Sequence, residues 1–229
     1  GGGKTSLIFY LVEKFSRQGK RVIVTTTTHM AWEEDRPFAD AEDTEELCRL
    51  IEQYGYVIAA KHKAGQPKIS GPEPETLKRL SGFCDLLLVE ADGARRLPLK
   101  VPAVHEPVIP EFADIVVGVT GLDCIGKKIC DIAHRPEDVA EFLRKKTDEP
   151  VMWEDVVKIA SSENGLRKNV GEKSFLVYFN KADVLESPGM AENIIKKCRE
   201  AGIEAVCGSL KKIMERQEIC RKFHGIRRK

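Results

Sequence analysis

The chain has 229 residues, of which 42% are hydrophobic, and it carries 37 basic against 36 acidic side chains. This balance gives no overall field that would attract nucleic acid or a membrane surface, and no apolar run approaches the ~20 residues of a membrane span. We therefore expect one globular domain over residues 1–229 that binds neither nucleic acid nor membrane.

Seven cysteines are scattered along the chain, and no CxxC pair occurs among them. This pattern argues against a zinc knuckle or a thioredoxin-type motif, and it fits a reducing, cytoplasmic location best. The tail over residues 220–229 is strongly basic. It is either a solvated C-terminus or an anion-binding extension.

Helical and strand-like patterns alternate from the start of the chain. Apolar residues recur at helical spacing over residues 4–18, and Gly19 is placed to end that helix. The β-branched run over residues 21–28 is typical of a buried parallel strand. The following elements are expected to be a helix near 43–54 with Leu47, Leu50, Ile51 and Tyr54 on one face, a short strand with the sequence YVIAAKH, and a helix over 73–81.

The second half of the chain continues this alternation. A strong strand over residues 85–93 ends in acids, and a proline-rich loop follows near 93–114. Further strands are expected from Ile115, over 174–183 and at IEAVCG, with helices near 136–146, 153–162 and 189–200 and from Leu210. The alternation predicts an α/β fold, a three-layer arrangement in which helices cover both faces of a mostly parallel sheet.

The opening stretch GGGKTS resembles the end of a phosphate-binding loop, GxxxxGK[ST]. In that pattern backbone N–H groups and the lysine hold phosphates, and the hydroxyl binds Mg²⁺. The candidate phosphate-binding residues are Gly1, Gly2, Gly3, Lys4, Thr5 and Ser6, with Thr5 also a Mg²⁺ ligand. A glycine-rich start is alternatively a cloning scar, but here GKT opens a helix that leads into a buried strand.

The stretch LLLVEADGA places Glu90 and Asp92 at the end of a hydrophobic strand. Carboxylates at this edge of a parallel sheet hold Mg²⁺ in many nucleotide sites, so both residues are candidate catalytic and metal-binding groups. Alternation along a strand would put them on the same face. The competing interpretation is an ordinary acidic turn that ends at Gly93.

The stretch NKAD, residues 180–183, follows the apolar run FLVYF. In GTP-binding proteins the NKxD aspartate accepts hydrogen bonds from two guanine donors that adenine lacks. Asn180, Lys181 and Asp183 are therefore candidate base-binding residues, and CGSL at 207–210 stands where a small loop closes over the base. Alternatively, NKAD is a polar turn in which Asp183 caps a helix.

The order GKT, acidic strand end and NKAD is the order that one nucleotide site requires. We expect these residues to converge on one nucleoside triphosphate with Mg²⁺, GTP rather than ATP. The pattern's first glycine would lie three places before Gly1, and the strand that normally precedes such a loop is missing from the sequence. We therefore expect that the sequence lacks roughly ten N-terminal residues with that first strand.

Several stretches together resemble the YqeC family, which is associated with accessory functions for selenium-dependent molybdenum hydroxylases. They are GGGKTS, TTTTH, VEADGARRLPLKVPAVHEPVIP, GLDCIGKKICDIAHRPE and FNKAD. The resemblance implies a P-loop NTPase-like protein in cofactor maturation, with a molybdenum hydroxylase or its cofactor precursor as partner. The EADG stretch is also similar to the ExxG element of metallochaperone-type GTPases that serve nickel enzymes.

The resemblance also draws attention to a second group of charged residues. It implies a possible site for an anionic substrate or a metal-cofactor intermediate, formed by Arg95, Arg96, Lys100, His105, Glu106, His134 and Arg135. The alternative is a proline-stiffened surface loop with solvated charges. His29, after four threonines, either orders a loop near the terminal phosphate or ends the strand.

Three functions fit these motifs. The first is a GTP-directed hydrolase that acts as an accessory protein. The second is a small-molecule kinase or transferase whose 93–135 loops bind an acceptor. The third is a non-catalytic module in which nucleotide only orders a partner-binding surface.

Overall fold

The computed structural model describes residues 2–31, 35–63 and 65–215. Gly1 and the basic tail at 220–229 lie outside the described residues. The chain divides into two compact units, unit 1 (Gly1–Ser6, Ala94–Ala103 and Ile115–Lys229) and unit 2 (Leu7–Gly93 and Val104–Asp114). Each unit is described by itself, and the expectation of one domain stays a prediction.

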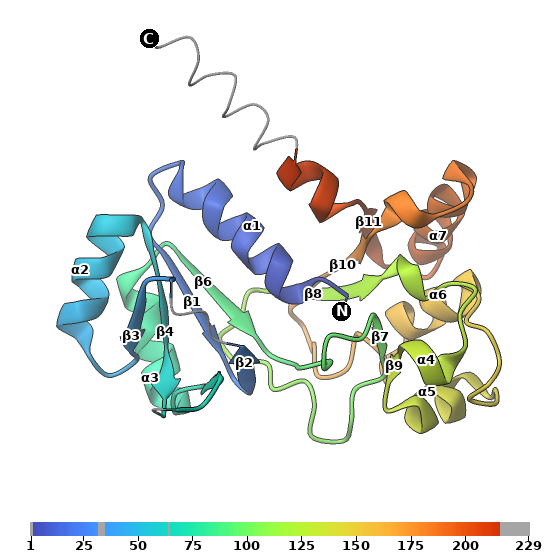
Figure 1. Cartoon of the computed structure of the whole chain (residues 1–229), viewed down its shortest axis with the longest axis horizontal. Coiled ribbons are helices and arrows are strands. Elements are labelled where there is room, and N and C mark those ends of the chain that lie inside the picture. Colours follow the sequence, from blue (N-terminus) through green and yellow to red (C-terminus); the bar gives the residue numbers. More distant parts are fainter. Residues whose placement is uncertain (1, 32–34, 64, 216–229) are drawn as a thin grey trace, which may run out of the picture. The chain divides into compact units, whose positions relative to one another are not determined.

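Unit 2 is built on a six-stranded sheet with the order β2-β5-β4-β1-β6, in which β3 also pairs with β4 (Figure 1). Strand β1 is parallel to both β4 and β6, whereas β5 runs antiparallel to β2 and β4. The elements are β1 (Val22–Thr26), β2 (His29–Ala31), β3 (Phe38–Asp40), α2 (Thr44–Tyr54), β4 (Tyr56–His62), β5 (Lys68–Ser70), α3 (Pro74–Leu80), η1 (Ser81–Phe83) and β6 (Leu86–Glu90).

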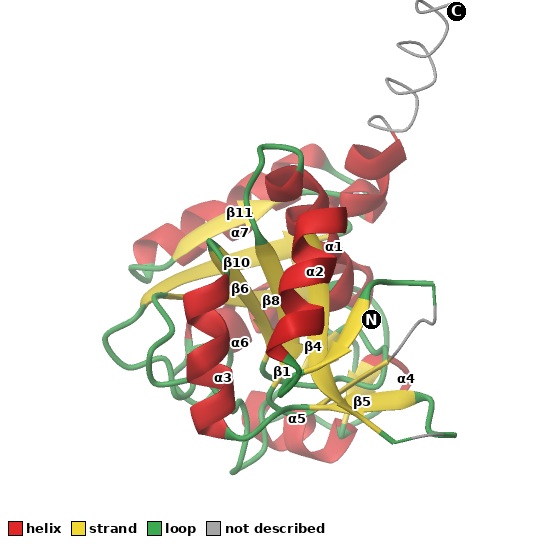
Figure 2. Cartoon of the chain, turned by 90° about the vertical axis from the view of Figure 1, so that its left-hand side faces the viewer, coloured by secondary structure: helices red, strands yellow, loops and turns green. Residues whose placement is uncertain are grey.

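Helices cover both faces of this sheet because its central strands are apolar on both sides (Figure 2). On one face Ile23 of β1 packs with Leu47 and Leu50 of α2. On the other face Val22 and Val24 pack with Ile8 and Val12 of α1 (Lys4–Ser16). The division between the units falls within α1, after Ser6.

The ends of helix α2 show how the sequence sets its bounds. Asp43 accepts a hydrogen bond from the N–H of Glu46, and Gly55 ends the helix in the left-handed region with φ +76°. Leu47, Leu50 and Ile51 are buried, as predicted. Tyr54 follows on the same face by helical spacing, but it is 50% exposed in the last turn and is not part of the core.

Unit 1 contains a three-stranded parallel sheet with the order β11-β10-β8 and a two-stranded parallel sheet of β7 and β9. Its core lies between these strands and the helices α4 to α7. The elements are β7 (Leu99–Lys100), β8 (Ile115–Gly121), η2 (Leu122–Cys124), α4 (Ile129–Ile132), β9 (Ala133–His134), α5 (Pro136–Leu143), α6 (Trp153–Ser161), β10 (Ser174–Asn180), η3 (Ala182–Val184), α7 (Pro188–Glu200) and β11 (Glu204–Cys207). Residues 210–215 are also helical.

The structure thus confirms a mixed α/β fold with parallel-rich sheets. The strands are distributed over separate sheets, with β6 last in the order of the unit 2 sheet and β8 last in that of the unit 1 sheet. Within the described ranges, none of the helices is both long enough and apolar enough to cross a membrane.

Candidate functional site

Asn180, the last residue of β10, joins three segments of unit 1. Its side chain is buried, with the residue 5% exposed. The Nδ2 group donates to the carbonyl oxygen of Gly2 at 3.1 Å, and Oδ1 accepts from the N–H of Leu210 at 3.1 Å. The asparagine of NKAD therefore holds the glycine-rich opening and the segment after β11 against the end of β10.

Gly3 fits beside this asparagine only because it has no side chain. A Cβ atom at Gly3 would lie 2.2 Å from Nδ2 of Asn180, and the φ of Gly3 is +105°. Helix α1 begins at the next residue, Lys4, and no acidic residue occupies its first turn. No carboxylate of the first turn therefore offsets the partial positive charge at the start of the helix. Thr5 and Ser6 are exposed in this turn.

The other two base-binding candidates make different contacts. Lys181 is in the left-handed region, with φ +63°, and its Nζ donates to Oδ2 of Asp123 at 2.6 Å. Asp183 is exposed in η3. A hydrogen bond from Ser209, aided by the charges of Lys212 and Lys211, holds the pKa of Asp183 below its usual value.

The CGSL segment lies directly against NKAD. The N–H of Gly208 donates to the carbonyl of Phe179, and its own carbonyl accepts from the N–H of Ala182, both at 2.9 Å. A Cβ at Gly208 would lie 2.6 Å from Oη of Tyr178. These contacts and the Ser209 bond to Asp183 hold the segment against NKAD, and its closing over a base stays a prediction.

Pro98 connects the proline-rich segment with the same region of unit 1. Its carbonyl oxygen accepts from the N–H of Gly121 at 3.2 Å and from Oγ1 of Thr120 at 3.0 Å. Gly2 packs on the same carbonyl, since a Cβ there would lie 3.3 Å from it. The segment before β7 is thus fixed to the C-terminal end of β8 and to the glycine-rich opening.

The acidic strand end lies in unit 2, where main-chain hydrogen bonds hold it. The carbonyl of Glu90 accepts from Oγ1 of Thr26 at 2.7 Å and from the N–H of Thr27 at 3.2 Å. Strand β6 ends at Glu90, so Asp92 lies in the loop beyond the strand and alternation does not extend to it. Glu90 is buried and Asp92 is half-buried.

The loop at 104–114 is hydrogen-bonded to the residues that directly follow β1 and β6 in unit 2. Val108 donates its N–H to the carbonyl of Ala91 at 3.1 Å and accepts from Oγ1 of Thr27 at 2.7 Å. His105 of this loop is exposed and Glu106 is half-buried. His29 is the exposed first residue of β2 and pairs with Ser70.

The second group of charged residues is divided between the two units. Lys100 and His134 are direct neighbours in the β7–β9 ladder, and Arg135 follows at the start of α5 with Nε 3.4 Å from Asp138. These residues, with Arg95 and Arg96, belong to unit 1. His105 and Glu106 belong to unit 2, and a common site with them stays a prediction.

Two residues with no role predicted from the sequence, Asp123 and Thr26, form hydrogen bonds with the motifs. Asp123 receives the Lys181 ammonium, and Thr26 bridges the ends of β1 and β6. Their place in the chain is the one feature that could have indicated these residues. Each lies at or just beyond the end of a strand that runs parallel to the strand carrying the motif.

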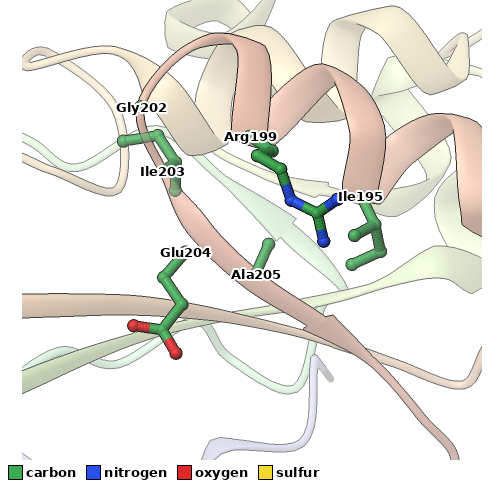
Figure 3. A pocket seen from close by; sticks show the side chains of 6 residues that line it. All are labelled: Ile195, Arg199, Gly202, Ile203, Glu204 and Ala205. Atoms are coloured by element: carbon green, nitrogen blue, oxygen red, sulfur yellow. The ribbon is translucent and has the colours of Figure 1, made fainter.

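Three further features of the described residues bear on function: a surface depression, the metal-binding side chains and the cysteine thiols. A surface depression at the start of β11 is lined by residues such as Arg199 and Glu204 (Figure 3). CGSL begins at the other end of that strand, at Cys207. No group of three or more metal-binding side chains occurs among the described residues. Burial raises the pKa of Cys124 to about 12 and that of Cys198 to about 11, so these thiols stay protonated near neutrality.

The predicted site residues thus form two groups. Gly2, Gly3, Lys4, Thr5, Ser6, Asn180, Lys181 and Asp183 belong to unit 1, and Glu90 and Asp92 belong to unit 2. Within unit 1, Asn180 brings the glycine-rich opening, NKAD and CGSL together. Convergence of both groups on one ligand stays a prediction.

Comparison with known proteins agrees with the resemblance noted in the sequence. The model of the family described as "YqeC protein" matches residues 1–137. The protein printed as "Uncharacterized protein YqeC" from Escherichia coli (strain K12) is 32% identical over 229 aligned residues, covering 97% of this chain and 88% of that protein. No solved structure gives a significant match. The chain belongs to the YqeC family.

Proposed function

We propose that this protein binds a nucleoside triphosphate with Mg²⁺, prefers GTP, and has a P-loop NTPase-like fold. The observation that carries the proposal is the position of the Asn180 side chain, which bonds both the segment before α1 and the segment after β11. A phosphate loop, a base-reading motif and a base-closing loop have to meet at one place in such a site. The buried amide supplies that connection within unit 1.

The phosphate end of the site would use the opening of α1. Gly2 and Gly3 let the backbone approach closely, and Lys4 adds a positive charge beside the amino end of the helix. Mg²⁺ prefers oxygen ligands, so the Thr5 hydroxyl and the Glu90 or Asp92 carboxylate fit that ion by chemistry. Bound Mg²⁺ would neutralise phosphate charge.

The base end would use Asp183, an exposed carboxylate whose lowered pKa keeps it ionised near neutrality. An ionised carboxylate accepts the two guanine donors, and adenine would leave it without them. Ser209 and the fixed CGSL segment orient the carboxylate from one side. Lys181, held by Asp123, would lie along the base.

We further propose that the nucleotide is hydrolysed slowly, in an accessory role for maturation of selenium-dependent molybdenum hydroxylases in the cytoplasm. The motifs that resemble the YqeC family support molybdenum hydroxylases as the enzymes that are assisted, and the phosphate-binding motif supports nucleotide hydrolysis. Hydrolysis in this class depends on positioning and charge stabilisation more than on covalent chemistry, so a partner would accelerate it.

Transfer of the phosphoryl group to a small acceptor is the second candidate. The observation in its favour is the pairing of Lys100 with His134 in the β7–β9 ladder, with Arg135 next in sequence. Lys100 and Arg135, from two segments, carry positive charges that suit an anionic acceptor. Turnover that requires an added cofactor precursor would favour this function, whereas turnover with water alone favours the first.

The test is nucleotide binding by the purified full-length protein. Saturating GTP·Mg²⁺ at a hundredfold over Kd should stabilise the fold by about 2.7 kcal/mol, a rise in Tm of roughly 5–10 °C. ATP should give a smaller shift at the same concentration. Equal shifts with both nucleotides would remove the guanine assignment, and no shift with either would remove the nucleotide proposal.

Asp183→Ala separates base reading from phosphate binding. Because Asp183 is exposed, its loss should leave the fold intact while the ratio of GTP to ATP affinity falls at least tenfold. Asp148→Ala, in a turn elsewhere in unit 1, removes the same charge and serves as the control. An unchanged ratio in Asp183→Ala would show that NKAD is only a turn.

A further inference from the structure

Strand β11 lies at the edge of the unit 1 sheet. It pairs with β10 on one side, and no other strand within the described ranges pairs with its outer side. The N–H of Gly208, directly after β11, donates to the carbonyl of Phe179 in β10. Because the main-chain groups of a strand point alternately to either side, those of Val206 also face β10, whereas those of Ala205 and Cys207 point to the open edge. This edge can therefore pair with another strand.

Helix α7 packs beside the open edge and turns one face toward it. Ile194 and Cys198 are buried in the core of unit 1, whereas Ile195 and Arg199 line the depression next to β11 (Figure 3). At about 3.6 residues per turn, Glu192 lies on the same side of the helix as Ile195 and Arg199. An acid, an apolar residue and a base thus follow one another along this face of α7.

The two charges on this face of α7 are available to a partner. Glu192 and Arg199 are exposed, and neither forms an ion pair within the described part of the chain. Lys197, on the other flank of the helix, is paired with Glu200. The side chain of Glu204 points away from the Arg199 guanidinium (Figure 3). The fold itself therefore gives no electrostatic use to this acid and this base.

The apolar residue of this face stands level with the middle of β11. Where α7 leads into the strand, the N–H of Ile203 donates to the carbonyl of Cys198 at 2.8 Å. At the other end of the strand, Sγ of Cys207 donates to the carbonyl of Ala191 at 3.9 Å. The helix and the strand therefore run in opposite directions, and Ile195 lies beside the central part of the strand.

We propose that a second copy of this chain binds at this edge, with the two β11 strands antiparallel about a twofold axis near Ala205. The N–H and C=O groups of Ala205 would bond those of the partner's Ala205 and join the two sheets into one. The inference goes beyond the proposed function and does not depend on it, because neither Ala205 nor this face of α7 belongs to the proposed nucleotide site.

The order of the charges on α7 identifies a second copy as the partner. A twofold axis reverses the direction of the partner helix, so a residue before Ile195 meets one after it. Glu192 of each copy therefore faces Arg199 of the other, and the half-buried Ile195 side chains pack together between these pairs. Each exposed charge that lacks a partner in one chain gains one in the dimer.

The first test is the mass of the purified full chain by sedimentation equilibrium over roughly 1–100 µM. The mass should rise with concentration toward twice that of one chain. Arg199→Glu creates two pairs of acids across the axis and should raise the dimer Kd at least about tenfold. Glu192→Arg creates two pairs of bases and should do the same. Both positions are exposed, so Tm should change by less than about 2 °C.

An equimolar mixture of Arg199→Glu and Glu192→Arg is the sharpest test. One copy then carries only acids at these two positions and the other only bases, so the mixture should form a heterodimer although each variant alone is monomeric. Lys197→Glu is the matched control, because it reverses one charge on the other flank of α7. Its dimer Kd should stay within about twofold of that of the unchanged chain.

Ala205→Pro tests the strand pairing itself. It removes an N–H from the open edge, where proline is tolerated, so it should abolish the dimer while the monomer stays folded. A chain that remains monomeric over the whole concentration range would overturn the inference. A dimer that survives both Arg199→Glu and Glu192→Arg would overturn it too, because it would use another surface. These charge variants decide the question even where Ala205→Pro does not fold.

Discussion

The C-terminal ends of β10 in unit 1 and β6 in unit 2 both carry polar motifs. At β10 a side chain forms hydrogen bonds to distant segments, whereas at β6 main-chain carbonyl groups form such bonds. At β10 the Asn180 side chain makes the long-range bonds, to Gly2 and Leu210. At β6 the carbonyls of Glu90 and Ala91 accept the hydrogen bonds from neighbouring segments. Substitution of the Asn180 side chain should therefore damage the fold at the first site, and loss of the Thr26 hydroxyl should weaken the second.

Asn180→Ala is the strongest test of this contrast. The change leaves a buried carbonyl and a buried N–H without their partner and should lower the free energy of unfolding by about 3 kcal/mol. Urea denaturation measures the loss. Asn193→Ala, at an exposed position of α7, is the control and should be neutral or slightly stabilising. A loss below about 1 kcal/mol would show that the two segments hold their positions without the amide.

Gly3→Ala should have the next largest effect. The new Cβ would meet Nδ2 of Asn180 and would occupy the left-handed region, so we expect a loss of about 2 kcal/mol. In the Asn180→Ala background the clash disappears and the cost of Gly3→Ala should be smaller. A double-mutant cycle by denaturation measures this coupling. Strictly additive losses would mean that the two residues do not constrain each other.

Thr26→Val tests unit 2 with a nearly isosteric change. It removes the hydrogen bond to the Glu90 carbonyl and the one from the N–H of Thr28, and should cost about 1.5 kcal/mol. Thr25→Val is the matched control in the same strand. Its buried hydroxyl has no hydrogen-bond partner within the described part of the chain, so the change should be neutral or stabilising. Equal losses would assign the effect to packing.

The smallest expected effect is the pH dependence of Asp183. Because its pKa is lowered, the carboxylate stays charged as pH falls toward the ordinary aspartate range. The affinity ratio of GTP to ATP should therefore be constant from about pH 8 to about pH 5. Ser209→Ala removes the largest cause of the lowered pKa, so the decline of the ratio should begin at a higher pH. Identical profiles for both proteins would contradict this role of Ser209.

Local pattern predicted most of the regular structure. The strand YVIAAKH corresponds to β4, and the helices expected at 4–18, 43–54, 73–81 and 189–200 are present with small shifts at their ends. Three-residue strands such as β2 and β3 were missed, because they are too short for a period to be recognised. Helical spacing alone does not tell that Tyr54, in the last turn of α2, is 50% exposed although it follows the buried Leu47, Leu50 and Ile51 on the same face.

Sequence motifs identified candidate residues more readily than the contacts that these residues make. The pattern NKAD points to Asn180 as a base-binding residue, which stays a prediction, and it gives no sign of the bonds that the side chain makes to Gly2 and Leu210, 178 and 30 residues away in sequence. The role of Asp123 had no sequence signal of its own, since its partner Lys181 is 58 residues away. Such pairs depend on which strands become neighbours.

The sequence by itself determined most of the helices and longer strands, the family and the residue types available for phosphate and base recognition, because these depend on local periodicity and on motifs of a few residues. The tertiary structure decided the contacts: the buried bonds of Asn180 and the position of the Pro98 carbonyl against Gly2. The physical reason is that a hydrogen bond or a steric limit between distant residues exists only after parallel strands have brought their ends together.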